Sequence, residues 1–214
     1  MTPRRRVAVL VSGAGSNLEA LARAAADPGY PAEVALVVSN RRDCAALGVA
    51  ARHGIPTLSL TVADFGGDAG VRDRAIVDAL RSAAIDLVVC AGYNRVLSDE
   101  VLAAFPDAIL NVHPSLLPAF GGGMHAVEDA LAAGVKVTGC TVHLLAAGDV
   151  DCGPIVAQAA VDVDDDDDAD SLRRRIHEEE WRLLPAAVAL WAEGRLRLEG
   201  RRVRVVAAAA ASAP

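Results

Sequence analysis

Asn111 and His113 are the two side chains that most directly indicate a reactive site. They close a short apolar run that begins at Ala108, and Pro114 follows at once. Side chains in a strand alternate between its two faces, so a spacing of two places the amide and the imidazole on one side. The amide can bond a carbonyl oxygen, and the imidazole can carry a proton near neutral pH. The pair suggests a catalytic platform, although a buried core histidine beside a turn asparagine explains the same two residues.

A second chemical feature lies near the N-terminus, where glycines separate an apolar run from a helical one. The pattern predicts a buried strand over 6–12, a turn at Gly13-Ala14-Gly15-Ser16 and a helix over 17–26. Backbone amides and the positive end of the helix dipole would meet at this turn and favour an anion. Leu18 occupies the third glycine position of a dinucleotide loop, so a single phosphate fits better than a pyrophosphate. A helix cap without a ligand is the alternative.

Strands alternate with helices through the first half of the chain, which predicts an α/β fold with a mostly parallel, doubly wound, Rossmann-like sheet. Ligands of such sheets lie beyond the carboxyl ends of the strands. Gly13, Gly92 and His113 all follow predicted strands, so we expect them to share a cleft. The other expected strands span 34–39, 57–60, 86–91, 137–145 and 155–161, and the expected helices 45–53, 71–83 and 171–193.

The C-terminal half predicts a mixed continuation of this sheet. The very acidic segment 162–170 indicates a solvated loop that ends at Asp170, the expected N-cap of the last helix. Two short apolar runs on either side of Glu199-Gly-Arg predict a hairpin within 195–206.

Composition and charge exclude several classes of function. The 214 residues carry a net charge of −7 and no basic run long enough for a nucleic-acid surface. No apolar stretch could span a membrane, and the run after the basic start is too short for a signal peptide. The four cysteines are scattered, without a Cys-x-x-Cys pair, and indicate reduced thiols of a cytoplasmic protein. We therefore expect small-molecule partners, with no nucleic acid, membrane or metal.

The string Asn-Val-His-Pro-Ser-Leu-Leu-Pro over 111–118 resembles the signature of the folate-dependent formyltransferases. Within them it is most similar to the members that act on glycinamide ribonucleotide in purine synthesis, and the resemblance covers about 7–195. It implies a formyltransferase-like fold and transfer of a formyl group from the co-substrate 10-formyltetrahydrofolate to the ribonucleotide amine. Asn111 and protonated His113 would stabilise the oxyanion, and no metal is implied.

Other motifs imply roles for further residues. Gly-x-Gly-Ser-Asn resembles the family's phosphate loop, Glu-x-x-x-x-Pro its ribose-binding motif, and Val-Asp-x-Gly-Pro its segment with the catalytic carboxylate. The resemblance assigns catalysis to Asn111, His113 and Asp151, and substrate binding to Gly15, Ser16, Asn17 and Glu180. It assigns folate binding to Tyr93, Asn94, Arg95, Val96, Leu97, Asn111, Ala147 and Asp151.

Three departures from the family's pattern leave points open. Asn94 stands where a Met is usual, which removes apolar contact and adds a polar group. The loop 119–125 and the interval before Asp151 are each one residue longer than usual. Asp149 is therefore a rival to Asp151 for the carboxylate role. A bulge over 146–148, which Gly148 favours, would keep Asp151 in register.

We expect one formyltransferase domain over 1–214. Residues 1–106 would form a half that binds nucleotide or phosphate, 107–206 a catalytic and folate-binding half, and 207–214 a loose tail. Alternatives are another folate-dependent formyl transferase, a formyltetrahydrofolate hydrolase, and a nucleotide-binding protein without catalysis. The methionyl-tRNA enzyme and the hydrolase carry a further domain for which this length leaves no room. The third alternative leaves Asn111, His113 and Asp151 without a shared purpose. The oligomeric state is open, a homodimer included.

Overall fold

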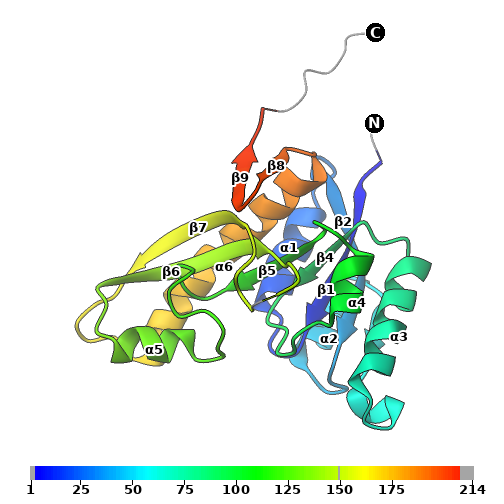
Figure 1. Ribbon diagram of the computed structural model, residues 1–214, viewed down its shortest axis with the longest axis horizontal. Coiled ribbons are helices and arrows are strands. Elements are labelled where there is room, and N and C mark those ends of the chain that lie inside the picture. Colours follow the sequence, from blue (N-terminus) through cyan, green and yellow to red (C-terminus); the bar gives the residue numbers. More distant parts are fainter. Residues whose placement is uncertain (1–2, 149, 208–214) are drawn as a thin grey trace.

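The computed structural model describes residues 3–148 and 150–207, and within them nine strands form one continuous sheet (Figure 1). The strands are β1 (Arg5–Val11), β2 (Ala32–Ser39), β3 (Thr57–Ser59), β4 (Leu87–Cys90), β5 (Ile109–His113), β6 (Val137–Leu144), β7 (Ile155–Asp162), β8 (Leu196–Glu199) and β9 (Arg202–Val205). The helices are α1 (Ser16–Ala25), α2 (Ala45–Arg52), α3 (Ala69–Ser82), α4 (Asp99–Ala104), α5 (Ala126–Ala132) and α6 (Ala169–Ala192), with a 3-10 turn at Val62–Phe65.

The strand order is β3-β2-β1-β4-β5-β6-β7-β9-β8. The first five strands of this order, from β3 through β2, β1 and β4 to β5, pair in parallel. Strand β6 is antiparallel to both β5 and β7. The β9–β8 hairpin closes the far edge, with β9 parallel to β7. Parallel neighbours need crossover helices and antiparallel neighbours need only turns, so helices alternate with strands only in the first part. This order confirms the predicted α/β fold, with its mostly parallel sheet and mixed C-terminal continuation.

Helices cover both faces of the parallel part. Val9 of β1 belongs to a buried cluster with Leu21 of α1 and Leu184 of α6, whereas Leu10 belongs to a second cluster with Ile76 of α3. A central parallel strand is buried on both faces, which explains why its apolar run shows no alternation with polar residues. Figure 1 shows α3 and α4 together on one side of the sheet.

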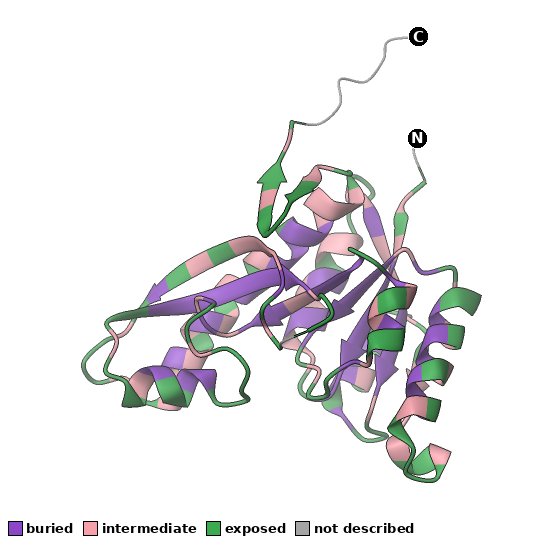
Figure 2. Cartoon of the chain, in the orientation of Figure 1, coloured by how far each residue is buried: buried purple, intermediate pink, exposed green. Residues whose placement is uncertain are grey.

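A third buried cluster lies under the antiparallel part. It joins Val127 of α5, Cys140 of β6 and Val161 of β7 to Leu172 and Ile176 of α6. Figure 2 shows β6 buried along nearly its whole length, whereas β7 alternates between exposed and partly buried residues. Helix α6 therefore packs under both parts of the sheet, and its middle turns reach the glycine turn before α1.

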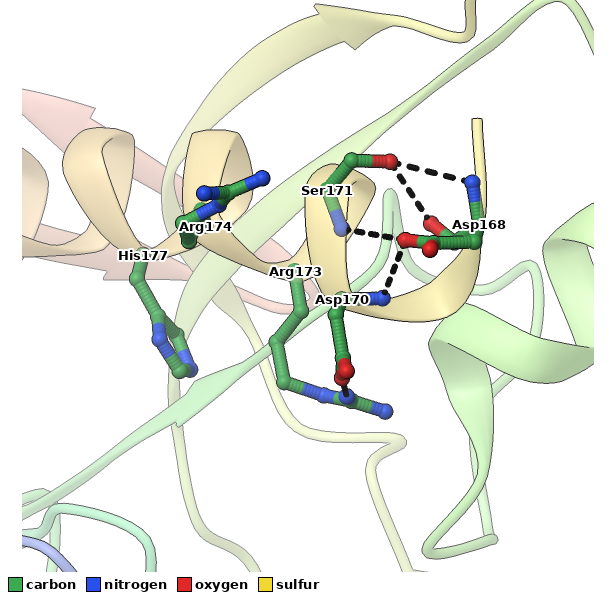
Figure 3. Close-up of a pocket in the computed structure, with 6 residues that line it drawn as sticks. All are labelled: Asp168, Asp170, Ser171, Arg173, Arg174 and His177. Atoms are coloured by element: carbon green, nitrogen blue, oxygen red, sulfur yellow. Dashed lines mark hydrogen bonds and ion pairs between the residues drawn. The ribbon is translucent and has the colours of Figure 1, made fainter. Parts of the chain in front are cut away.

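The start of α6 corrects one prediction, since its N-cap is Asp168 and not Asp170. The Asp168 carboxylate accepts hydrogen bonds from the backbone N–H groups of Asp170 at 3.0 Å and Ser171 at 2.7 Å (Figure 3). The Asp168 N–H in turn donates to the Ser171 hydroxyl oxygen, and this second hydrogen bond completes a capping box. Ser171 at the third helical position decides between two aspartates that are equally good caps.

Two helices were not predicted from the sequence. Helix α4 has six residues and α5 has seven, which is too short for a helical period to show. The expected loose tail, 207–214, lies outside the described residues except for Ala207, which is exposed. Within the described ranges no helix combines the length and the apolar character needed to cross a membrane.

Candidate active site

The end of β5 places Asn111 and His113 on one side of the sheet, and β6 adds His143 beside them. Asn111 and His143 are register partners across the antiparallel β5–β6 pair, and Asn111 Nδ2 lies 3.0 Å from His143 Nε2. His143 Nδ1 lies 3.2 Å from the carbonyl oxygen of Leu144. A carbonyl only accepts, so Nδ1 carries the proton and Nε2 accepts from the Asn111 amide. His143 thus orients the amide of Asn111.

His143 was not predicted from the sequence. Its only signal was the register between two strands 32 positions apart, which no local pattern reveals. Cross-strand partners on one face of an antiparallel pair lie close together, so a correct register would have placed His143 beside Asn111.

The buried ring of His113 lies between two hydrogen-bond acceptors. Its Nδ1 is 3.3 Å from Asp151 Oδ2, and its Nε2 is 3.0 Å from the backbone carbonyl oxygen of Phe120. Only the doubly protonated imidazolium offers a donor to each of them. In its cationic form His113 donates to both acceptors, and Asp151 is then its counter-ion.

Asp151 is the carboxylate that faces these side chains. Its Oδ2 accepts the Gly122 N–H at 2.9 Å, and its Oδ1 lies 3.5 Å from Asn111 Nδ2 and 3.6 Å from His143 Nε2. Burial opposes ionisation of Asp151, but the hydrogen bond from the Gly122 N–H and the positive charge of His113 outweigh it and hold its pKa below the usual range. Asp151 is therefore ionised at neutral pH.

The rival carboxylate, Asp149, lies outside the described residues. Gly148 just before it has a φ of 117°, a conformation that L side chains rarely adopt. Residues 146–148 lie after the end of β6, in the loop before β7, so the bulge expected there is not part of the ladder; the register of β6 and β7 shifts between Val142 and His143 instead. Ala147 is exposed in the same turn.

The turn before α1 is shaped by two glycines with different constraints. Gly15 is the N-cap of α1, with a φ of 83°, and a Cβ on it would lie 2.7 Å from the Cα of Ala46. Gly15 is therefore required by packing against α2 as well as by its backbone angle. Gly13 has no such restriction, because a Cβ on it would meet no atom within 4 Å among the described residues. The first N–H groups of α1 have no partner within the helix and can bind an anion at this turn.

A cavity of about 240 Å³ adjoins this turn. Its walls come from four regions that are distant in sequence, namely the glycine turn, the ends of β4 and β5, the start of α5 with Met124 before it, and α6. The residues that line it are Gly13, Ala14, Gly15, Ser16, Asn17, Ala91, Gly92, Val112, Pro114, Met124, Ala126, Val127, Glu128, Arg173, His177 and Glu180. All four residues that the resemblance assigned to substrate binding therefore line one cavity.

The catalytic side chains are on the other face of β5. Among the described residues, Val112 and Pro114 line the cavity but Asn111, His113 and Asp151 do not. Alternate side chains of a strand point to opposite faces, which explains the division. The expected common cleft therefore contains Gly13 and Gly92 but not His113. A ligand held in the cavity must pass the end of β5 to reach the imidazole.

Glu180 and Asn17 form the polar wall of the cavity. Asn17 Nδ2 donates to Glu180 Oε2 at 2.7 Å, and both side chains are buried. Asn17 Oδ1 is also buried and has no hydrogen-bond partner within the described ranges. Burial raises the pKa of Glu180 to about 7, against the effect of the Asn17 bond. The wall thus offers acceptor oxygens, which suits a ligand with hydroxyl donors.

This burial predicts a pH dependence of stability. The Glu180 carboxyl ordinarily titrates near 4.5, whereas in the folded chain it keeps its proton up to about pH 7. Between these values the folded state binds more protons, so the free energy of unfolding falls as pH rises. Glu180→Gln should remove this slope and should be more stable than the wild type at pH 8 by on the order of 3 kcal/mol. Denaturant unfolding at pH 5 and pH 8 measures both effects.

The matched control for that experiment is Glu178→Gln on the exposed side of the same helix. It should leave the pH slope of the wild type unchanged. If Glu180→Gln retained the full slope, the buried carboxyl would not be the titrating group.

The N-terminal turns of α6 bring two basic side chains to the cavity. Figure 3 shows Arg173 and His177 pointing to the same side of the helix and Arg174 pointing to another. Arg173 is paired with Glu128 and with Asp170. Burial, and secondarily the charge of Arg173, lowers the pKa of His177. The charge of Arg173 is therefore already balanced and His177 is mostly neutral near pH 7, so the glycine turn is the anion-binding end of the cavity and Glu180 its hydroxyl-binding end.

The segment assigned to folate follows β4 and begins next to the catalytic strand, since Cys90 is the register partner of Asn111. Leu97 is buried and Tyr93 is partly buried, whereas residues 94–96 are exposed. The unusual Asn94 is anchored, because its Oδ1 accepts from Asn40 Nδ2 at 2.8 Å and its N–H donates to Ser12 Oγ at 3.0 Å. The polar side chain thus ties this segment to the residue after β2, and the backbone bond ties it to the residue after β1.

The arrangement can bind an anion and hydroxyl groups in the cavity and can stabilise an oxyanion and move a proton at the end of β5. Within the ranges that the structure describes, no group of three His, Cys, Asp or Glu side chains is arranged to hold a metal ion.

Known proteins match the chain through nearly its whole length. Residues 5–188 match the family model described as formyl transferase. The chain is 46% identical over 206 residues to the phosphoribosylglycinamide formyltransferase of Mycobacterium tuberculosis, covering 94% of each protein. It is 44% identical over 193 residues to the trifunctional purine biosynthetic protein adenosine-3 of Drosophila melanogaster; these residues are 89% of this chain and 14% of that protein. The crystal structure of glycinamide ribonucleotide transformylase 1 from Symbiobacterium toebii is similar with a TM-score of 0.93 and 46% identity, over 97% of this chain and 96% of that one. The family match includes every site residue described above.

Proposed function

The chain belongs to the formyl transferase family, and on that premise we propose that it transfers a formyl group from 10-formyltetrahydrofolate to the amine of glycinamide ribonucleotide in purine biosynthesis. The observation that carries the proposal is the contact of His113 Nδ1 with Asp151 at 3.3 Å, beside Asn111 and next to an anion-binding cavity. A nucleotide-binding protein would need the cavity but not this group of side chains.

In the proposed reaction the substrate amine attacks the formyl carbon, and negative charge develops on the formyl oxygen. Donors placed where that charge develops stabilise the transition state. The amide of Asn111 and the imidazolium of His113 are these donors. One Asn111 N–H is directed to His143, and the other makes only a long contact of 3.5 Å with Asp151, which the formyl oxygen can replace. The Nε2–H of His113 likewise exchanges the Phe120 carbonyl for the substrate oxygen.

Asp151 has two roles in this scheme. Its charge keeps His113 in the cationic form, and it accepts the proton that the attacking nitrogen loses, directly or through water. The intermediate then breaks the bond between the formyl carbon and N10 of the folate, and N10 takes up one proton. The products are the formylated amine and tetrahydrofolate, so atoms and charge balance without a covalent enzyme intermediate.

The two substrates are assigned to separate surfaces. The ribonucleotide phosphate is held by Gly15, Ser16 and Asn17, and its ribose hydroxyls by Glu180. The folate is held by the segment 93–97 with Asn111, Ala147 and Asp151. Under this assignment each of the expected halves, 1–106 and 107–206, contributes to both substrates, because the segment 93–97 lies in the first half and Glu180 lies in the second. Both partners are small molecules, and we place the reaction in the cytoplasm. A homodimer stays a prediction, which sedimentation of the purified chain would test.

The proposed function is tested by mixing the purified chain with both substrates and following formation of tetrahydrofolate. Turnover should require the ribonucleotide. Release of formate from the folate alone would instead indicate a hydrolase, and binding of the ribonucleotide without turnover would indicate a nucleotide-binding protein.

Replacing Asp151 with asparagine should lower kcat by about tenfold or more, which is the scale of general acid–base assistance. Asparagine keeps an acceptor for the Gly122 N–H but removes the counter-ion of His113. The measurement is kcat at saturating concentrations of both substrates. Asp149→Asn serves as the control and should cost much less. A larger loss in Asp149→Asn would assign the carboxylate role to Asp149.

A further inference from the structure

A buried ion pair lies outside the catalytic group and the cavity. Arg72 and Asp73, on α3, are 2% and 3% exposed. Arg72 Nε donates to Asp73 Oδ1 at 2.9 Å, and Arg72 Nη2 pairs with the same oxygen. Charged side chains are rarely fully buried unless they are paired, and replacing such a pair by apolar residues is often neutral or stabilising. Stability alone is therefore a weak reason for a buried arginine at this position.

The pair makes two further contacts, both with one segment. Arg72 Nη1 donates to the Tyr93 hydroxyl at 3.1 Å, and Asp73 Oδ2 accepts the backbone N–H of Ser98 at 3.1 Å. Tyr93 is the first residue of the folate-binding segment of the proposed function, and Ser98 directly follows its last residue. The arginine thus holds one end of that segment and the aspartate holds the other.

Between these two anchors the segment is open. Arg95 and Val96 are exposed, with Val96 at 72%, whereas Tyr93 is partly buried and Leu97 is buried. Burial, against the charge of Arg72, raises the pKa of Tyr93 to about 12, so its hydroxyl is neutral and accepts from the guanidinium. A loop with free side chains and two fixed ends presents a preformed surface to a ligand.

We propose that Arg72 and Asp73 are positioning residues for the folate co-substrate, which hold the segment 93–98 in its binding conformation through Tyr93 and Ser98. This inference rests on the proposed function. A binding loop that occupies its competent conformation only part of the time binds more weakly in proportion to that fraction. The guanidinium is suited to the task, because its planar fork holds the donors for the carboxylate and for a further acceptor in fixed directions, whereas an ammonium group is a point charge on a flexible stem.

The test is steady-state kinetics of Arg72→Met with both substrates varied. The KM for 10-formyltetrahydrofolate should rise about ten- to hundredfold, the equilibrium ratio that corresponds to losing a hydrogen bond to a charged group. The KM for glycinamide ribonucleotide and kcat should stay within about threefold, because the cavity and the catalytic side chains keep their contacts. Arg74→Met is the matched control on the same helix. Arg74 is exposed and paired with Glu100, so its loss should change neither KM.

Two further variants keep the test decisive if Arg72→Met folds poorly. Tyr93→Phe removes only the hydroxyl and leaves the ion pair intact. It should also raise the folate KM. In the double variant with Arg72→Lys, the folate KM should rise by less than the product of the increases in the two single variants. Equal changes in both substrates' KM, or an unchanged folate KM in folded Arg72→Met and Tyr93→Phe, would overturn the proposal. Absence of formyl transfer in the wild type would instead refute the proposed function.

Discussion

Asn111→Ala should lower kcat by about two to three orders of magnitude, the range found when a single oxyanion donor is removed. The side chain is placed for this role at the end of β5, where His143 holds its amide nitrogen at 3.0 Å. Alanine removes the donor and creates only a small cavity at a partly buried position. Folate affinity, measured by equilibrium binding, should change much less than kcat. Rapid-mixing measurements of a single turnover would show that the chemical step has slowed.

The matched comparison is His143→Gln, which keeps a polar group beside Asn111 but no longer fixes its orientation. We expect a smaller loss of kcat, because the donor itself is still present. A loss in His143→Gln as large as that in Asn111→Ala would assign the effect to the hydrogen-bonded pair. Turnover of Asn111→Ala within a few-fold of the wild type would mean that Asn111 is not the oxyanion donor.

Gly13→Asp should raise the KM for the ribonucleotide by about two orders of magnitude, because a carboxylate within several ångströms of a phosphate costs a few kcal/mol at a protein surface. Gly13 is the suitable position, since no atom of the described residues lies within 4 Å of a Cβ placed there. The same change at Gly15 would push against Ala46 and would disturb packing as well as charge. Kinetics with each substrate varied in turn measure the effect.

Gly13→Asn has nearly the same size without the charge and is the control. It should raise the ribonucleotide KM only slightly, and neither variant should change the folate KM more than a few-fold. If the aspartate and asparagine variants weakened both substrates equally, the turn would be structural and the phosphate would bind elsewhere.

The elements were predictable where the pattern is local. The apolar run at 7–11, the glycine turn and the alanine- and leucine-rich helix after it each depend on residues within a few positions of one another. The same holds for Asn111 and His113, whose common side follows from the alternation along one strand. The family motifs were equally local, and the fold, the family and the type of reaction followed from them.

Contacts between distant segments were decided by the tertiary structure. His143 joined the catalytic group through the β5–β6 register, and Arg72 met Tyr93 through packing of α3 beside the segment after β4. The N-cap of α6 moved from Asp170 to Asp168 because the side chain of Ser171 completed a box around one aspartate. The face of β5 on which the cavity lies could not be read from the strand itself. Local chemistry limits which residues can act, but register and packing, which depend on the whole chain, determine which of them meet.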